Sequence, residues 1–116
     1  MRHRKTVKTL DRGAAARKAL LRNLATSLVL YEKIKTTRAK AKAVQSMVER
    51  VITKGRANSL HTRRELLKVL FGESTVKKVL EDLSPRYKDR SGGYTRISRI
   101  GRRAGDAAEM VQIEFV

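Results

Sequence analysis

The chain has 116 residues, of which 28 are Lys or Arg and 11 are Asp or Glu, so its formal net charge is +17. A hydrophobic content of 41% suffices for one domain with one core and argues against wholesale disorder, and the absence of cysteine excludes disulfides, thiolate metal sites and cysteine nucleophiles. No apolar stretch approaches the ~20 residues of a membrane span, and no apolar run follows the basic N-terminus, so we expect neither membrane insertion nor a secretory signal.

Residues 1–10 are basic and contain little apolar sequence, which predicts an arm in front of a single domain spanning residues 11–116. An untethered, disordered terminus is the alternative interpretation of this segment. Asp11 is a candidate cap for a first helix that runs to about Leu28 and carries leucines along one side.

A short strand is expected over residues 31–36, and a second helix is expected from Arg38 to about Thr53. The apolar positions of this helix are spaced as on one helix face (residues 44, 47, 48 and 51). Its first turns carry Arg38, Lys40 and Lys42, which oppose the helix dipole unless an anion binds there. Simple solvation of these cations is the alternative.

Two further helices are expected in the middle of the chain. The third begins at Asn58 or Ser59 and ends near Phe71. The fourth is short and opens at Ser74 or Thr75, with apolar residues again at the spacing of one helix face (76, 79, 80 and 83). Pro85 is expected just beyond its end.

The apolar period changes from the helical value to two after residue 93. Residues 94–100 and 110–116 read as strands joined by a short turn, which is typical of an antiparallel hairpin. The strand at residues 31–36 can join them. We therefore predict an α+β fold in which about four helices pack on a short mixed sheet of about three strands (31–36, 94–100 and 110–116).

The basic residues gather in three segments. Residues 1–22, 33–42 and 86–103 hold eight, five and seven Lys or Arg, with at most one acid each, whereas residues 104–116 hold three acids and no base. Binding of a nucleic acid relieves the repulsion among these positive side chains and releases the counterions condensed on the nucleic acid. We therefore expect a nucleic-acid partner on one face, although a merely soluble basic surface is the alternative.

The most informative stretch runs from Pro85 to Arg96. Its arginine side chains match phosphate oxygens with two parallel hydrogen bonds. Tyr87 and Tyr94 could stack on bases between these cations, and the Gly92-Gly93 pair lets the backbone approach a phosphate. Alternatively, Tyr94 is a core residue at the start of a strand and the glycine pair is an ordinary turn.

Enzymatic chemistry finds no support in the motifs. His3 and His61 are too few and too far apart in the chain for a metal cluster, and no P-loop, nucleophile elbow or dinucleotide-binding motif is present. We expect no catalytic residue, metal, cofactor or small-molecule substrate. The alternatives to a structural RNA-binding protein are a free DNA-binding protein of nucleoid or regulatory type and a basic enzyme acting on RNA.

The chain resembles the family of the bacterial large-subunit ribosomal protein seventeen along essentially its whole length. The blocks that carry this resemblance are Met1-Arg2-His3-Arg4, Arg17-Lys18-Ala19-Leu20, Arg22-Asn23-Leu24-Ala25-Thr26-Ser27-Leu28, Ile34-Lys35-Thr36-Thr37, Ala39-Lys40-Ala41-Lys42, Leu60-His61-Thr62-Arg63-Arg64, Pro85-Arg86-Tyr87-Lys88-Asp89-Arg90, Gly92-Gly93-Tyr94-Thr95-Arg96-Ile97 and Gly105-Asp106-Ala107-Ala108. Ser91 departs from the family, which often has proline there.

The resemblance implies a structural constituent of the large ribosomal subunit that stabilises its RNA near the nascent-chain exit. It also implies neighbouring large-subunit proteins as partners, no homo-oligomer, and a place in cytoplasmic ribosomes, or in an organelle matrix if the source is an organelle. Together with the charge pattern it yields these candidate RNA-binding residues: Arg2, His3, Arg4, Lys5, Lys8, Arg12, Arg17, Lys18, Arg22, Lys35, Arg38, Lys40, Lys42, Arg86, Tyr87, Lys88, Arg90, Gly92, Gly93, Tyr94, Arg96 and Arg99.

Overall fold

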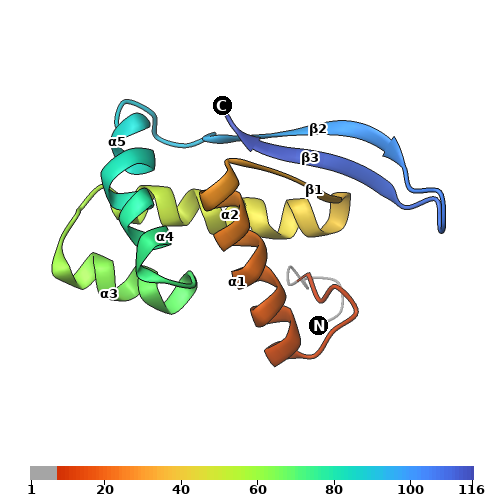
Figure 1. The fold of residues 1–116 in the computed structure, drawn as a ribbon, viewed down its shortest axis with the longest axis horizontal. Helices are drawn as coiled ribbons and strands as arrows, with labels where there is room; N and C mark the ends of the chain where they lie inside the picture. Colours follow the sequence, from red (N-terminus) through yellow and green to blue (C-terminus); the bar gives the residue numbers. More distant parts are fainter. Residues whose placement is uncertain (1–7) are drawn as a thin grey trace, which may run out of the picture.

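The helices precede the β-hairpin along the chain, because apolar residues recur at helical spacing up to residue 93 and at every second residue after it. A computed structural model describes residues 8–116 (Figure 1). Its elements, in chain order, are α1 (Ala14–Tyr31), β1 (Lys33–Thr37), α2 (Arg38–Gly55), α3 (Leu60–Val69), α4 (Glu73–Lys78), the π-helical turn η2 (Val79–Leu83), α5 (Ser84–Arg86), β2 (Thr95–Arg102) and β3 (Glu109–Phe115). The predicted α+β class, with about four helices and three strands, is confirmed.

Helix α1 begins and ends later than predicted. Its N-cap is Gly13, and Asp11 lies two residues earlier in a left-handed conformation, so the predicted cap at Asp11 is wrong. The helix continues through Val29, which is fully buried, and ends at Tyr31, with Glu32 as its C-cap. Glu32 adopts φ 64°, and its backbone N–H donates to the Leu28 carbonyl at 2.8 Å, which closes the last turn. The first strand therefore begins at residue 33 rather than 31.

The middle helices differ from prediction mainly at their ends. Ser59 caps α3 as expected, because its hydroxyl accepts from the Thr62 N–H at 3.1 Å. For α4 the N-cap is Gly72 rather than Ser74 or Thr75. The helical path then continues through η2 into α5, so Pro85 lies inside it and not beyond its end. Pro85 lies in the first turn of α5, directly after the π-helical turn η2, so it stands where the hydrogen-bond register of the helix changes.

The sheet is antiparallel throughout, which corrects the predicted mixed sheet. Its strand order is β1-β3-β2, with Ile34 opposite Ile113 on one side of β3 and Ile97 opposite Ile113 on the other. A bulge interrupts the β2–β3 register between Arg99 and Gly101, where Gly101 adopts φ 148°.

The helices cover one face of the sheet and leave the other open (Figure 1). Val111 and Ile113 of β3 belong to the same buried core as Val44, Val48 and Ile52 of α2, all three of which are fully buried. The far part of the β2–β3 hairpin extends beyond the helices, so Ile100 is 51% exposed. The division between an arm and a domain at residue 10 stays a prediction, since residues 1–7 lie outside the described part.

Candidate nucleic-acid interface

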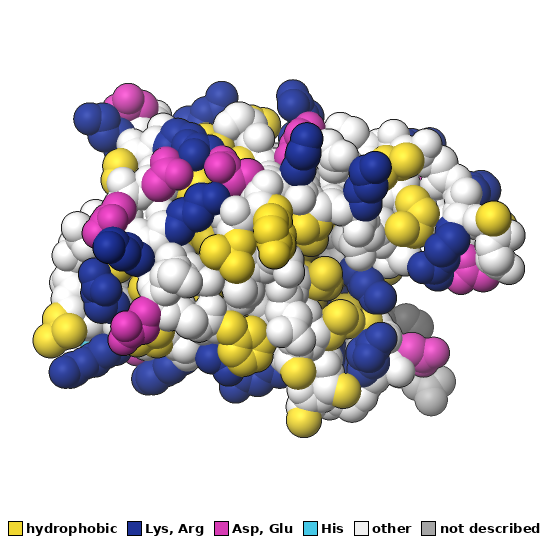
Figure 2. Space-filling view, viewed as in Figure 1, with side chains coloured by type: hydrophobic (Ala, Val, Ile, Leu, Met, Phe, Trp, Pro, Cys, Tyr) yellow, Lys and Arg dark blue, Asp and Glu magenta, His cyan; other side chains and the backbone are white. Residues whose placement is uncertain are grey.

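Positive charge concentrates where α1 and α2 begin. Residues 8–42 contain ten Lys or Arg and two acids, whereas residues 43–94 contain eleven Lys or Arg and six acids. Figure 2 shows most of the acidic side chains visible from this side over the left half of the molecule, where α3, α4 and α5 lie in Figure 1. The end at which α1 and α2 begin is therefore the more positive part of the described chain.

The first turns of α1 and α2 combine cations with free backbone donors. Neither helix has an acid in its first turn or a side-chain hydrogen bond at its cap. Arg17 and Lys18 lie in the first turns of α1, and Lys40 and Lys42 lie in those of α2. These four cations form no ion pair within residues 8–116. An anion such as a phosphate would satisfy both the N–H groups and the side chains.

The open face of the sheet adds a row of charges across all three strands. Lys33 lies opposite Glu114 in the register, and Glu114 lies opposite Arg96. The Arg96 Nη2 donates to Glu114 Oε1 at 3.1 Å. Lys35 follows on the same face of β1 and is exposed. This face is thus basic but partly neutralised by Glu114.

Several predicted phosphate ligands are paired within the fold. Glu109 forms salt bridges with Arg99 (3.1 Å) and with Arg38 (3.7 Å), so one carboxylate joins the hairpin to the start of α2. At the hairpin turn, the guanidinium of Arg103 lowers the pKa of Asp106 to about 2. Exposed pairs of this kind add little stability, so a phosphate can replace the carboxylate.

The expectation that Tyr87 and Tyr94 stack on bases is wrong for this structure. Tyr94 is fully buried and Tyr87 is 4% exposed, and their ring centroids lie 5.4 Å apart in the core. The Tyr94 hydroxyl accepts from Arg56 Nη2 at 2.7 Å and lies 3.0 Å from Thr53 Oγ1. A ring held in this way presents no face to RNA, because its partners come from α2 and the 87–94 loop.

Arg22 also serves the fold rather than an outer surface. Its Nη2 donates to the carbonyls of Leu67 (3.0 Å) and Leu70 (3.1 Å), and its guanidinium lies 4.0 Å from the centroid of the Phe71 ring. These contacts close the C-terminus of α3, which ends at Val69, before the predicted Phe71. The sequence-based assignment of Arg22 to a phosphate is therefore corrected.

Arg86 is a second arginine held within the fold. It is hydrogen-bonded to Glu32 and forms two 3.1 Å bonds to Asp82, and Lys78 lies 3.4 Å from Glu32. The hydrogen bond from Arg86 lowers the pKa of Glu32 and raises that of Arg86 itself. The cluster joins α1 to α4 and α5, so we no longer expect Arg86 to be a free phosphate ligand.

The remaining predicted residues fall into two separate places. Lys8 and Arg12 are exposed ahead of α1, whereas Lys88 and Arg90 are exposed in the loop after α5. Arg90 Nη1 donates to the Gly93 carbonyl at 3.2 Å, and Gly93 adopts φ 65°. The predicted residues of the arm (Arg2, His3, Arg4 and Lys5) lie outside the described part of the chain.

Sequence reasoning missed two exposed cations on the second half of α2. Arg50 and Lys54 are four residues apart and form no ion pair within residues 8–116. They continue the i, i+4 series that passes through Lys42 and Ser46. That series was the available signal, but it falls outside the three segments in which the basic residues are densest.

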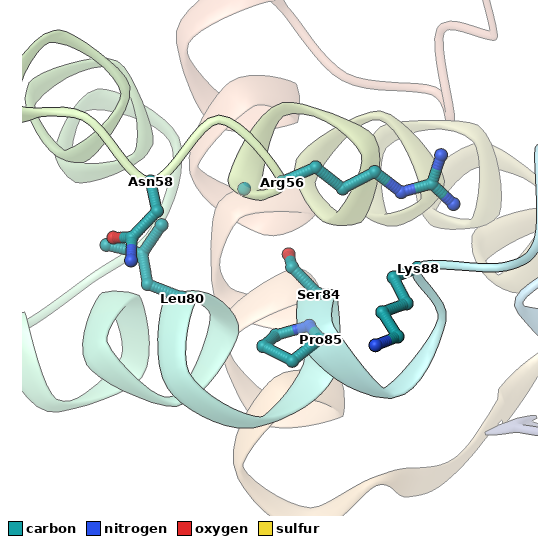
Figure 3. A pocket seen from close by; sticks show the side chains of 7 residues that line it. Arg56, Asn58, Leu80, Ser84, Pro85 and Lys88 are labelled. Atoms are coloured by element: carbon teal, nitrogen blue, oxygen red, sulfur yellow. The ribbon is translucent and has the colours of Figure 1, made fainter.

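A pocket of about 280 Å³ between the end of α2 and α5 carries no catalytic arrangement (Figure 3). Leu80 and Pro85 form part of its wall, and the Ser84 hydroxyl donates to the Ile52 carbonyl at 2.9 Å, so no base activates it. Figure 3 shows the Arg56 side chain directed away from Leu80 and Pro85. Its Nη2 donates to the Tyr87 carbonyl and to the Tyr94 hydroxyl. Across residues 8–116, no group of three or more His, Asp or Glu is placed to hold a metal ion.

None of the helices in the described residues combines the length and apolarity that crossing a membrane requires.

Comparison with known proteins gives one consistent result. A family model described as ribosomal protein L17 matches residues 20–116. The large ribosomal subunit protein bL17 of Caldanaerobacter subterraneus subsp. tengcongensis is 49% identical over 107 residues, which cover 92% of this chain and 96% of that protein. The protein of the same name from Syntrophotalea carbinolica is 47% identical over 116 residues, covering 100% of this chain and 75% of the relative. That of Halalkalibacterium halodurans is 47% identical over 115 residues, covering 92% and 96%.

Proposed function

The chain belongs to the ribosomal protein L17 family, whose members are structural, non-enzymatic components of the large ribosomal subunit, and from this premise we propose that it binds and stabilises large-subunit ribosomal RNA. The observation that carries the proposal is the set of cations at the first turns of α1 and α2 that form no ion pair within residues 8–116. Residues 8–42 have an excess of eight positive charges, from ten Lys or Arg and two acids. Counterion release makes RNA a favourable partner for such a surface.

Contact is directed mainly at the RNA backbone rather than at base edges. The deep, narrow major groove of A-form RNA hides the bases from side chains. The buried positions of Tyr87 and Tyr94 leave the described chain without its two predicted stacking rings. Recognition then depends on the shape of the folded RNA and on the spacing of its phosphates.

The less basic side of the molecule is proposed to face other components of the subunit or solvent. Helix α4 carries Glu73, and the turn η2 carries Glu81 and Asp82. Together with the family resemblance, this asymmetry supports a position beside neighbouring ribosomal proteins near the nascent-chain exit. The bacterial relatives support a cytoplasmic ribosome as the setting.

The salt dependence of RNA binding tests the proposal. If about eight phosphates are neutralised, the affinity for large-subunit ribosomal RNA transcribed in vitro falls with a log–log slope of roughly −6 to −7. We expect Lys18→Ala/Lys42→Ala to make the slope shallower by about 1.5. The matched control Lys68→Ala/Lys77→Ala removes the same charge from α3 and α4 and should change the slope little.

Two results would refute the proposal. One is a wild-type slope near −2, which is too shallow for a multi-phosphate interface. The other is absence of the protein from large subunits that have been washed in high salt and sedimented through a sucrose gradient.

A further inference from the structure

A cleft of about 400 Å³ lies between the second half of α2 and the loop before β2. Arg50 and Lys54 line its α2 side, and Ser91 and Gly92 line its loop side. It is separate from the first turns of α1 and α2, where the proposed function places the main basic surface. Two cations and the exposed backbone of a glycine therefore line the same cleft.

The walls of the cleft are held in place without a ligand. Tyr94, at its base, is fully buried, and its hydroxyl lies 3.0 Å from Thr53 Oγ1 of α2 and 3.3 Å from the Arg90 carbonyl. Arg56 reinforces the loop by donating to the Tyr87 carbonyl at 2.7 Å. A ligand therefore meets a preorganised site and pays little entropy for ordering the loop.

The loop backbone is open to the cleft at Gly92. A Cβ built on Gly92 meets no atom within 4 Å, and its φ is not in the left-handed region. Neither packing nor conformation therefore requires glycine at this position. A side chain can therefore be added at Gly92 without a clash inside the fold, and in its absence a ligand can come close to the backbone.

The cleft continues a line of positive charge along α2. Lys42, Arg50 and Lys54, with the neutral Ser46 between the first two, lie at intervals of four residues, so these three cations extend over about 18 Å of helix. It begins at the basic end of the molecule, where RNA is proposed to bind. A polyanion with regularly spaced charges can follow this line, whereas a single small anion would occupy one point on it.

We propose that this cleft binds a phosphodiester of the ribosomal RNA backbone, with Arg50 and Lys54 contacting its oxygens and the Gly92 backbone lying against it. The inference rests on the proposed function, because it assigns a second point of attachment on the same RNA. The protein then holds two RNA segments, one at the start of α2 and one near its end, and fixes their relative positions.

Glu49 is the acidic residue among those that line this cleft, so removing its charge tests whether the ligand is an anion. Its Oε1 accepts from the Thr95 hydroxyl at 3.1 Å, which a glutamine Oε1 can also do. Glu49→Gln therefore keeps the hydrogen bond and removes a charge that repels phosphate. We expect it to tighten RNA binding about three-fold or more, while Glu73→Gln, an exposed change of the same charge on α4, has a smaller effect.

The main experiment adds a side chain to the loop. We expect Gly92→Val to weaken binding of in vitro transcribed large-subunit ribosomal RNA about five-fold or more without changing Tm, because the new methyl groups occupy the cleft. Gly105→Val is the matched control, since a Cβ there also meets no atom within 4 Å and its φ is also not left-handed. Arg50→Ala/Lys54→Ala tests the other wall and should make the salt slope shallower by about 1.5.

The outcomes separate this inference from the proposed function. If wild-type protein binds the RNA and Gly92→Val binds it equally well at unchanged Tm, the cleft is not an RNA site although the proposed function stands. If wild-type protein fails to bind the RNA, the proposed function fails first. If Gly92→Val instead abolishes binding of a labelled polyglutamate peptide and leaves RNA binding intact, the cleft accepts an acidic peptide and the inference is overturned.

Discussion

Replacement of Arg22 by alanine distinguishes a structural arginine from an RNA-binding one. In the folded chain its guanidinium donates to two carbonyls at the end of α3 and lies over the Phe71 ring. The substitution removes the charged donor to both carbonyls, which costs about 2 kcal/mol. It also removes the contact with the Phe71 ring, which costs about 0.5–1 kcal/mol. The buried Nε of Arg22 has no partner within the described residues, and its removal offsets a small part of this loss.

We therefore expect Arg22→Ala to lower the free energy of unfolding by about 2–3 kcal/mol, which corresponds to a fall in Tm of roughly 10 °C for a chain of this length. Urea and thermal denaturation followed by circular dichroism measure both quantities. Arg17→Ala is the matched control on the same helix, where we expect a change within about 0.5 kcal/mol.

RNA binding supplies the opposite test for the same two variants. Arg17→Ala should make the salt slope shallower by about 0.7–0.9, whereas Arg22→Ala should leave it nearly unchanged when measured well below its Tm. A variant Arg22→Ala with wild-type stability and a shallower slope would refute the structural interpretation and restore Arg22 as a phosphate ligand.

Three further perturbations test the packing around the site. The hydrogen bond with Arg86 lowers the pKa of Glu32, so the pair stabilises the fold fully above the ordinary carboxyl pKa and less as pH falls through the lowered pKa. The Tm values of the wild type and of Glu32→Gln, measured between about pH 6 and pH 3, should therefore converge at the acid end. Gly55→Ala places a methyl group 2.2 Å from Ser84 Oγ, so urea denaturation should show a loss of about 1–3 kcal/mol, and a loss below 0.5 kcal/mol would mean that Ser84 moves freely. Tyr94→Phe removes the hydroxyl that joins α2 to the loop and should cost about 1–2 kcal/mol in the same assay, while unchanged stability would show that these hydrogen bonds contribute nothing net.

The fold was largely predictable because most of its elements follow local patterns. The stripe of Val44, Val48 and Val51 on α2 is buried as its spacing predicted, and the alternation of Val111 and Ile113 places them in the core. Element ends were less predictable, because they depend on partners from elsewhere in the chain. The end of α3 is one case, since the arginine that closes it comes from α1, 45 and 48 residues away.

The candidate site, like the fold, was predictable from the sequence only in part. The density of positive charge pointed to the starts of α1 and α2, where Lys18, Lys40 and Lys42 form no ion pair with residues 8–116, and their contact with RNA stays a prediction. It could not distinguish an arginine that faces outward from one that pairs with Glu32 or caps a helix. Nor could it show that Arg50 and Lys54 lie across a cleft from the glycine loop.

By itself, the sequence determined the α+β class, the order of the helices and the large positive net charge from which we propose a polyanionic partner. Periodicity and net charge can be read from the residues themselves and do not depend on how the elements pack. Only the tertiary structure decided which cations are free, which tyrosines are buried and where a cleft forms. Those properties depend on contacts between residues far apart in the chain, such as Tyr94 with Thr53 and Arg86 with Glu32, and no local pattern encodes them.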